Sequence, residues 1–191
     1  QMCKETGYKQ GEDLLHGPVV VGGNGRLAEQ ITSLLDGPYK LIKAEADTKR
    51  AGIVFDATQL EKPEDLVQLY EFFNPQLKKV LDNARIVVIG TTPELLENAD
   101  ARIAARALEG FTRSLAKEMR KSATVQLVYV DPAIDGAQIN KVESTLRFLL
   151  SGKSAFVDAQ VIRITPVDVQ LPENWETVSY THLTLPTNRE V

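Results

Sequence analysis

The residues best suited to chemistry form a glycine-rich turn between an apolar run and an amphipathic segment. In VVVGGNGRLAEQI (residues 19–31), Gly23, Gly25 and Ala28 have the G-x-G-x-x-G/A spacing of a dinucleotide-binding turn. Glycines there let the backbone turn tightly and approach a pyrophosphate, which then lies at the positive end of the next helix. The same turn can also simply join a buried strand to a helix, so the spacing alone leaves both interpretations open.

Other polar residues are weaker candidates for a site. In a dinucleotide site, an acidic residue about 20 positions beyond the turn binds the ribose, and Glu45 or Asp47 lies near that distance. Asp56 follows an apolar run, at the edge where open sheets bind ligands, although a turn-forming role is the simpler interpretation. Carboxylates at a helix start stabilise the helix dipole more often than they catalyse. Three of them flank one predicted helix: Glu94, Glu97 and Asp100.

The composition indicates one globular domain with tails. The 191 residues are 43% apolar and 25% charged. The net charge of −4 argues against a nucleic-acid or anionic-membrane surface, because both need clustered lysine and arginine. Cys3 is the only cysteine, so we expect no intrachain disulfide and a cytoplasmic location. His16 and His182 are the only histidines, so we expect neither a metal site nor a Ser/His/Asp triad.

Short apolar runs alternate with longer segments of helical period. The predicted strands are 19–21, 40–43, 53–55, 85–89, 124–130 and 161–164. The predicted helices are 26–35, 63–81, 100–121 and 140–150. Because strand and helix alternate, the pattern predicts right-handed βαβ units and an α/β fold. We expect a doubly wound parallel sheet, in a degenerate Rossmann- or flavodoxin-like three-layer sandwich.

The pattern divides the chain into four segments. The last of them, VSYTHLTLPTNREV, resembles a translated sequencing-library adapter, and we exclude it from fold reasoning. We expect an N-terminal extension, a Rossmann-like domain, the start of a linker and this adapter-like tail, at residues 1–16, 17–170, 171–177 and 178–191.

Several segments resemble the short-chain dehydrogenases/reductases. ALEGFTRSLAKEM (107–119) is similar to the helix after their active-site tyrosine, and RIVVIGTT (85–92) to the strand carrying their catalytic serine. FVDAQVIRI (156–164) resembles their closing strand. Together with GIVFDATQL and LYEFFNP, these segments resemble the amino-terminal domain of the two-domain, high-molecular-weight 3-oxoacyl-[acyl-carrier-protein] reductases. The resemblance implies a degenerate Rossmann domain in front of a reductase domain, with PENWE where the linker begins.

The resemblance also implies that the catalytic residues are missing. Alignment on GFTRSLA puts Ala101 in place of the family's tyrosine, Ala105 in place of its lysine and Thr91 in place of its serine. The family's asparagine would lie near Leu66, where no asparagine is found. The tyrosine donates a proton to the carbonyl oxygen and the lysine lowers its pKa, so two alanines predict no turnover.

The cofactor loop departs from the family pattern as well. Thr-Gly-x-x-x-Gly-x-Gly would lie over residues 21–28, where Gly22 keeps the first glycine but Arg26 and Ala28 replace the others. We expect the Arg26 side chain to lie where the backbone should meet the pyrophosphate. The adenine-side turn Asn-Asn-Ala-Gly is reduced to Asp56, Ala57 and Thr58. At most, the chain keeps a vestigial cofactor-binding set: Gly22, Gly23, Gly25 and Ala28.

Three functions compete. The first is a non-catalytic scaffold domain of a 3-oxoacyl-acyl-carrier-protein reductase, whose complete form would reduce 3-oxoacyl thioesters with NAD(P)H bound in a domain absent from this chain. The second is a nucleotide-binding oxidoreductase in its own right. The third is a flavodoxin-like FMN binder, which would need hydroxyls that GGNGR lacks. We favour the first, without a cofactor in this chain.

The expected partners of such a domain are its own C-terminal reductase domain and a second copy of the chain. By resemblance, the helices at 63–81 and 100–121 would form the homo-oligomer. The residues expected to make this contact are Leu69, Phe72, Phe73, Ala101, Ala104, Ala105 and Ala107. The alternative is that both helices only cover the sheet.

Overall fold

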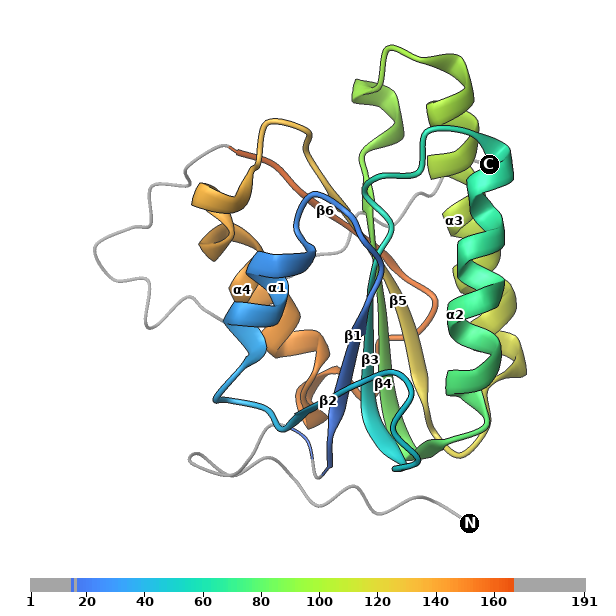
Figure 1. The fold of residues 1–191 in the computed structure, drawn as a ribbon, viewed down its shortest axis with the longest axis vertical. Helices are drawn as coiled ribbons and strands as arrows, with labels where there is room; N and C mark the ends of the chain where they lie inside the picture. The colour runs from blue at the N-terminus through green and yellow to red at the C-terminus, as the bar shows by residue number, and fades with distance from the viewer. Residues whose placement is uncertain (1–14, 16, 167–191) are drawn as a thin grey trace.

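The computed structural model describes residue 15 and residues 17–166. Its described strands form one parallel sheet in the order β2-β1-β3-β4-β5-β6 (Figure 1). The strands are β1 (Val19–Gly22), β2 (Leu41–Ile42), β3 (Arg50–Asp56), β4 (Val80–Thr91), β5 (Thr124–Val130) and β6 (Val161–Ile164). The α-helices are α1 (Ala28–Leu35), α2 (Val67–Leu77), α3 (Ala99–Glu118) and α4 (Asn140–Leu149). Short 3-10 turns lie at Pro63–Leu66, Pro93–Leu95, Gly136–Gln138 and Gly152–Ser154.

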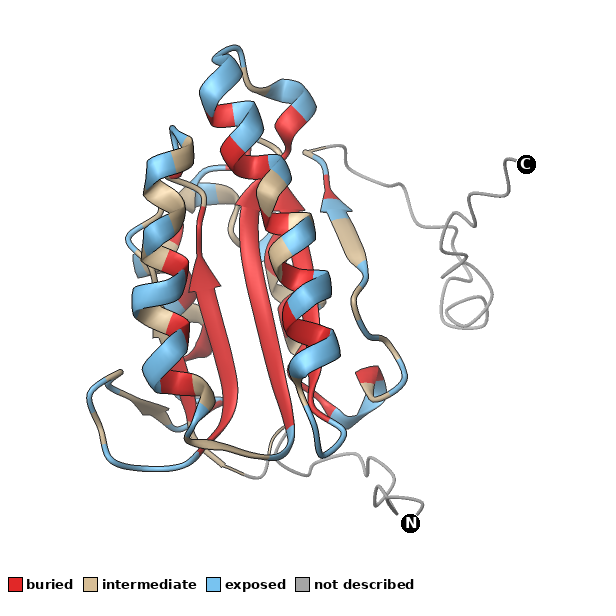
Figure 2. Cartoon of the chain, turned by 90° about the vertical axis from the view of Figure 1, so that its right-hand side faces the viewer, coloured by how far each residue is buried: buried red, intermediate tan, exposed pale blue. Residues whose placement is uncertain are grey.

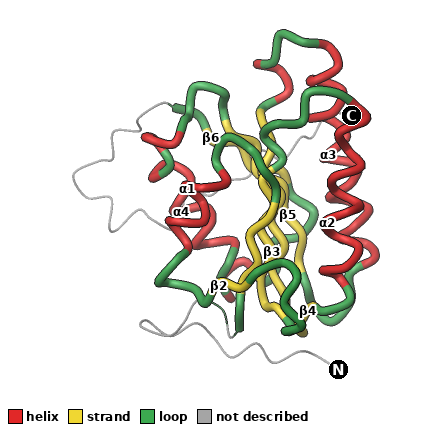
Figure 3. Tube along the Cα trace, in the orientation of Figure 1, coloured by secondary structure: helices red, strands yellow, loops and turns green. Residues whose placement is uncertain are grey.

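The helices lie on both faces of the sheet, which confirms the predicted three-layer α/β fold. Helices α1 and α4 cover one face, and α2 and α3 cover the other (Figure 1 and Figure 3). Chain order along the sheet reverses between β1 and β3. In doubly wound sheets, ligands bind beside the carboxyl ends of the strands at such a reversal. The fold therefore places its candidate site there.

The central strands are apolar on both faces because each face is covered by helices. Every residue of β3 and β5 is buried (Figure 2). Successive side chains of a strand point to opposite faces, so Val54 packs with the α1–α4 side and Phe55 with the α2–α3 side. Runs such as IVFD and VQLVYV form strands for this reason, rather than helices with one apolar stripe.

All four predicted helices have somewhat different bounds in the structure, and two of the differences have a clear cause. The predicted helix 26–35 begins at Ala28, because Arg26 and Leu27 lie in a turn. The predicted helix 63–81 is wrong at its C-terminal end, since α2 ends at Leu77 and β4 already begins at Val80. Backbone pairing of Val80 with Arg50 of β3 decides this boundary, and side-chain periodicity does not report such a pairing.

Helix α3 buries most of its alanines. Asn98 caps the helix by accepting hydrogen bonds from the backbone N–H groups of Asp100 (2.8 Å) and Ala101 (3.4 Å). Ala101, Ala104 and Ala105 are buried, and so are Leu69 and Phe73 of α2. Most of the residues predicted to contact a second subunit are therefore buried inside this chain.

Three of the predicted segment boundaries cannot be placed on this structure. Of the predicted extension 1–16, only residue 15 is described, and the linker start 171–177 and the tail 178–191 lie outside the described residues. Among the described helices, none combines the length and the apolar character needed to cross a membrane.

Candidate functional site

A buried carboxylate lies against the start of α1, at the carboxyl end of the sheet. Asp56, the last residue of β3, is 1% exposed. Its Oδ2 accepts a hydrogen bond from the backbone N–H of Leu27 (2.9 Å), and its Oδ1 accepts one from that of Thr58 (3.0 Å). Burial raises the pKa of the Asp56 carboxyl, while these N–H groups and the nearby Arg26 guanidinium oppose the shift. An internal anion thus occupies the kind of position that a phosphate takes at a helix N-terminus.

Residues 22–28, here called the glycine loop, are shaped by contacts inside the protein. A Cβ on Gly25 would overlap the Asp56 carboxylate, and one on Gly23 would overlap the Asp56 backbone. Gly23 also has a positive φ of +85°, which side-chain-bearing residues rarely adopt. A Cβ on Gly22 would overlap the ring of Phe72. Each glycine of the motif therefore has an internal neighbour that requires it, without reference to a nucleotide.

Arg26 does not occupy the position expected of it. Its guanidinium donates hydrogen bonds to carbonyl oxygens after β5, those of Ile134 and Asp131 (3.0 Å to Asp131). Its backbone N–H donates to Thr58 Oγ1 (2.9 Å). The group that lies against the α1 N-terminus is Asp56, so the expectation that Arg26 itself would fill the pyrophosphate position was wrong.

The three positions aligned with the family's serine, tyrosine and lysine meet at one cavity. Thr91, Ala101 and Ala105 line a pocket of about 360 Å³ beside the ends of β3 and β4, here called the alanine pocket. The Thr91 hydroxyl donates a hydrogen bond to the Thr58 carbonyl (3.2 Å). Leu66 is not part of it and packs between α2 and α3 instead. The other lining residues are Ala57, Thr58, Gln59, Leu60, Glu61, Leu96, Glu97 and Asn98.

The alanine pocket can enclose a small molecule but offers little acid–base chemistry. Its floor carries methyl groups where a reductase needs a phenol and an ammonium group. The carboxylates of Glu61 and Glu97 lie on exposed residues at its rim. Within the described part of the chain, no group of three or more His, Cys, Asp or Glu side chains could hold a metal ion.

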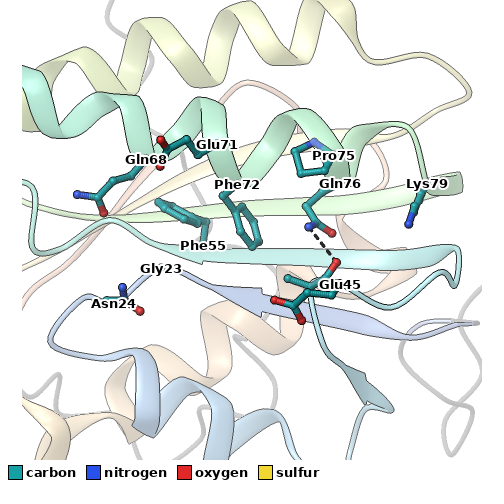
Figure 4. Close-up of a pocket in the computed structure, with 11 residues that line it drawn as sticks. Gly23, Asn24, Glu45, Phe55, Gln68, Glu71, Phe72, Pro75, Gln76 and Lys79 are labelled. Atoms are coloured by element: carbon teal, nitrogen blue, oxygen red, sulfur yellow. Dashed lines mark hydrogen bonds between the residues drawn. The ribbon is translucent and has the colours of Figure 1, made fainter.

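A second cavity, the switch-point groove, lies where the strand order reverses. It has a volume of about 480 Å³ and extends from Gly23 across Phe55 to α2 (Figure 4). Glu45 lines it, whereas Asp47 is exposed and pairs with Lys79 (2.9 Å). Of the two acids proposed for a ribose, the structure therefore brings only Glu45 to the groove. The other lining residues are Asn24, Ala44, Gln68, Glu71, Phe72, Pro75, Gln76 and Lys79.

Glu94, an acidic residue before α3, forms ion pairs that the sequence did not indicate. Glu94 accepts two hydrogen bonds from Arg163 of β6 (2.8 and 2.9 Å) and pairs with Arg106 of α3 (2.5 Å). The hydrogen bonds from Arg163 lower the pKa of Glu94 to about 2. The cap of α3 is Asn98, not one of the carboxylates. No sequence signal indicated Arg163, because it is 69 residues away.

Comparison with known proteins finds matches in structure but none in sequence. No protein-family model and no curated protein matches the sequence. A short-chain dehydrogenase/reductase from Serratia marcescens superposes with a TM-score of 0.64 at 14% identity, over 80% of this chain and 97% of that one. A short-chain dehydrogenase family protein from Francisella tularensis gives 0.58 at 17% (78% and 96%).

A third solved structure carries a cofactor. BdcA in complex with NADPH superposes with a TM-score of 0.59 at 14% identity, over 80% of this chain and 94% of that one. At such identities the likeness concerns the architecture alone, since one fold hosts many functions. Sheet order, helix layers and these superpositions together show that the chain has the Rossmann-like fold of the short-chain dehydrogenases/reductases.

Proposed function

We propose that this chain is a non-catalytic, Rossmann-like amino-terminal domain of a two-domain 3-oxoacyl-[acyl-carrier-protein] reductase. The alanine pocket carries the proposal. Ala101 and Ala105 line it beside Thr91, at the positions where the reductases that the sequence resembles carry tyrosine and lysine. A methyl group can neither donate a proton nor lower a neighbour's pKa. The complete, cytoplasmic protein would reduce 3-oxoacyl thioesters with NAD(P)H held in its reductase domain.

The glycine loop supports the absence of a cofactor from this chain. Asp56 already accepts the Leu27 N–H at the start of α1 (2.9 Å). A pyrophosphate at the same place would meet this buried carboxylate, and like charges in a buried site repel each other strongly. Binding of a dinucleotide would therefore require Asp56 to leave the glycine loop.

A turnover assay tests the catalytic half of the proposal. The purified chain is given an acetoacetyl thioester with NADH or NADPH, and we expect no oxidation of either nicotinamide. The double variant Ala101→Tyr/Ala105→Lys should remain inactive, because Asp56 still occupies the glycine loop. Turnover that scales with purity and is lost in a Thr91→Ala variant would overturn the proposal.

The association half concerns the outer face of α2 and α3. Val67, Tyr70 and Ile103 expose 54%, 68% and 56% of their surface there. Beside them, an apolar groove of about 420 Å³ runs between Tyr70 and Phe111. We propose that a second copy of the chain covers this face, and that the reductase domain is the other partner. Burying such a face contributes roughly 25 cal/mol per Å² before the costs of association.

Sedimentation equilibrium tests the association. We expect a concentration-dependent dimer that Ile103→Glu dissociates. The matched control is Phe156→Glu, which changes a residue that is 99% exposed in the loop before β6 and should leave the dimer intact. A monomer at every concentration that also fails to bind the separately expressed reductase domain would overturn this half.

A nucleotide-binding oxidoreductase domain is the second candidate, because the fold resembles that of an NADPH-bound protein. Calorimetric titration with NADPH separates the two candidates. We expect no saturable heat, whereas a dissociation constant in the low micromolar range would favour the second candidate.

A further inference from the structure

We propose that Asn24 is a site of spontaneous covalent modification, at which loss of ammonia converts the side-chain amide into a carboxylate and loosens the glycine loop. This inference is independent of the scaffold and association roles proposed above. It rests on the exposure of Asn24, on the absence of a side chain at Gly25, and on the buried Asp56 carboxylate behind the loop.

The side-chain amide of Asn24 and the backbone nitrogen of Gly25 are both open to reaction. Asn24 is exposed and lines the switch-point groove on its glycine-loop side (Figure 4). Within the described residues, the Asn24 amide forms no hydrogen bond and the Gly25 N–H donates to no acceptor. The N–H of Leu27, by contrast, is bonded to Asp56 Oδ2 (2.9 Å). The two groups that must react are therefore adjacent in the chain and unprotected.

Asp56 keeps the position after Asn24 free of a side chain. A Cβ on Gly25 would overlap the Asp56 carboxylate. That carboxylate is buried and bonded to the Leu27 N–H, so it is not free to move aside. A side chain at position 25 would crowd the attacking nitrogen and restrict the backbone, whereas glycine does neither. The fold therefore requires, directly after an exposed asparagine, the residue that hinders this attack least.

The reaction consumes only water. The Gly25 nitrogen attacks Cγ of Asn24, the N–Cγ bond forms, the Cγ–Nδ2 bond breaks, and ammonia leaves with the proton of the Gly25 nitrogen. Water then opens the cyclic imide and returns a proton to that nitrogen. Cleavage of the N–Cγ bond gives aspartate, and cleavage of the bond to the main-chain carbonyl carbon gives isoaspartate. Each product carries a carboxylate in place of the amide.

Both products disturb the contact between the glycine loop and Asp56. Gly23 and Gly25, on either side of Asn24, lie against the backbone and the carboxylate of Asp56. The new carboxylate therefore arises beside a buried anion, and like charges disfavour each other there. Isoaspartate also adds a methylene group to the main chain between the two glycines, which shifts one glycine relative to the other. We expect the hydrogen bond from Leu27 to Asp56 to weaken as a result.

Peptide mapping of the full chain, incubated at mildly alkaline pH, tests the modification. We expect loss of ammonia at Asn24 to be at least about tenfold faster than at Asn83 and Asn98, because both of these exposed asparagines precede alanine. A protein isoaspartate methyltransferase should label the peptide that contains Asn24. In the matched variant Asn24→Gln, the attack needs a larger ring, so this peptide should lose the label. A rate at Asn24 no greater than at Asn83 and Asn98, or a label that persists in Asn24→Gln, would overturn the inference.

Urea denaturation tests the effect on the loop. The deamidated fraction, separated by ion exchange, should unfold at a lower urea concentration than the unmodified chain. Asn24→Asp adds the charge without the extra methylene group, so its midpoint should lie between the two. In an Asp56→Asn background, Asn24→Asp should lose its effect, because the buried anion is gone.

If Asp56→Asn does not fold, the order of the other three midpoints decides the point. Equal midpoints for the unmodified and deamidated chains would show that the modification leaves the loop intact, and would overturn the loosening. Neither measurement bears on the turnover or sedimentation assays, so this inference and the proposed function fail separately.

Discussion

The glycine loop and the alanine pocket lie at the same edge of the sheet but are built in opposite ways. In the glycine loop, the side chain of Asp56, 29 residues beyond Leu27, fills the turn and accepts a hydrogen bond from the Leu27 N–H. In the alanine pocket, the local cap Asn98 completes the helix start, and two small side chains leave a cavity. Thr58 links the two regions, because its Oγ1 accepts a hydrogen bond from the Arg26 N–H and its carbonyl oxygen accepts one from the Thr91 hydroxyl.

This difference shows why a motif can keep its spacing without its ligand. Gly23 and Gly25 are required by Asp56, whatever else binds. Ala101 and Ala105 line a cavity, so on that side no neighbouring atom requires a small side chain. Substitutions should therefore be costly in the loop and mild in the pocket.

The largest effect is expected for Gly23→Ala. The new Cβ would overlap the Asp56 backbone at a residue whose φ is +85°, so we expect a loss of roughly 3 kcal/mol of unfolding free energy. The matched control is Gly37→Ala, because Gly37 has a φ of +94° but no atom near its Cβ position. Urea denaturation of both variants isolates the contact from the strain. Equal losses would show that Asp56 does not hold the loop.

Removing the carboxylate should come next. Asp56→Ala leaves the Leu27 and Thr58 N–H groups without their acceptor, and we expect a loss of roughly 2 kcal/mol. Asp47→Ala, which removes an exposed carboxylate paired with Lys79, should produce no measurable change in the urea midpoint. If both variants have the same urea midpoint, the buried Asp56 carboxylate does not stabilise the glycine loop.

The ion pairs of Glu94 should make the stability of the fold depend on pH. Its pKa is lowered to about 2 from the ordinary 4.5, so its stabilising effect is complete above about pH 4.5 and is lost as the pH falls toward 2. In Glu94→Gln, unfolding midpoints should vary less over this window than in the unmodified chain. Glu97→Gln serves as the control, since Glu97 forms no ion pair within the described part of the chain. An unchanged profile in Glu94→Gln would contradict the assignment.

The smallest effect is expected in the alanine pocket. Ala101→Tyr places a ring beside a cavity of about 360 Å³, and we expect a change within about 1 kcal/mol. Ala104→Tyr on the same helix is the contrast, because Ala104 is fully buried against the sheet and overpacking there should cost about 3 kcal/mol. Thermal unfolding of the pair measures the difference, and similar losses would show that the pocket is not open to a larger side chain.

Much of the fold followed from local pattern. The runs that became β5 and β6 were predicted with the bounds they have, because valine- and isoleucine-rich segments between turns suit strands covered on both faces. Alternation of strand and helix was enough to predict the parallel sheet and its three layers. The resemblance aligned Thr91, Ala101 and Ala105 with the catalytic residues of the family, and these three residues line one pocket in the structure.

The site itself depended on contacts that no local pattern reports. Periodicity marked Ala101, Ala104 and Ala105 as a small-residue surface, and only the tertiary structure showed that all three are buried. Glu45 and Asp47 are equally acceptable from spacing, but only the path of the chain after β2 brings Glu45 to the groove.

The sequence by itself determined the layers, because burial of apolar residues follows period and composition along a single segment. Only the tertiary structure decided what the glycine loop holds. Asp56 reaches Leu27 because β3 lies beside β1 in the sheet, and Phe72 covers Gly22 because α2 packs on the same face. Such neighbours are set by how strands and helices are ordered in space, which the spacing of residues within one motif does not specify.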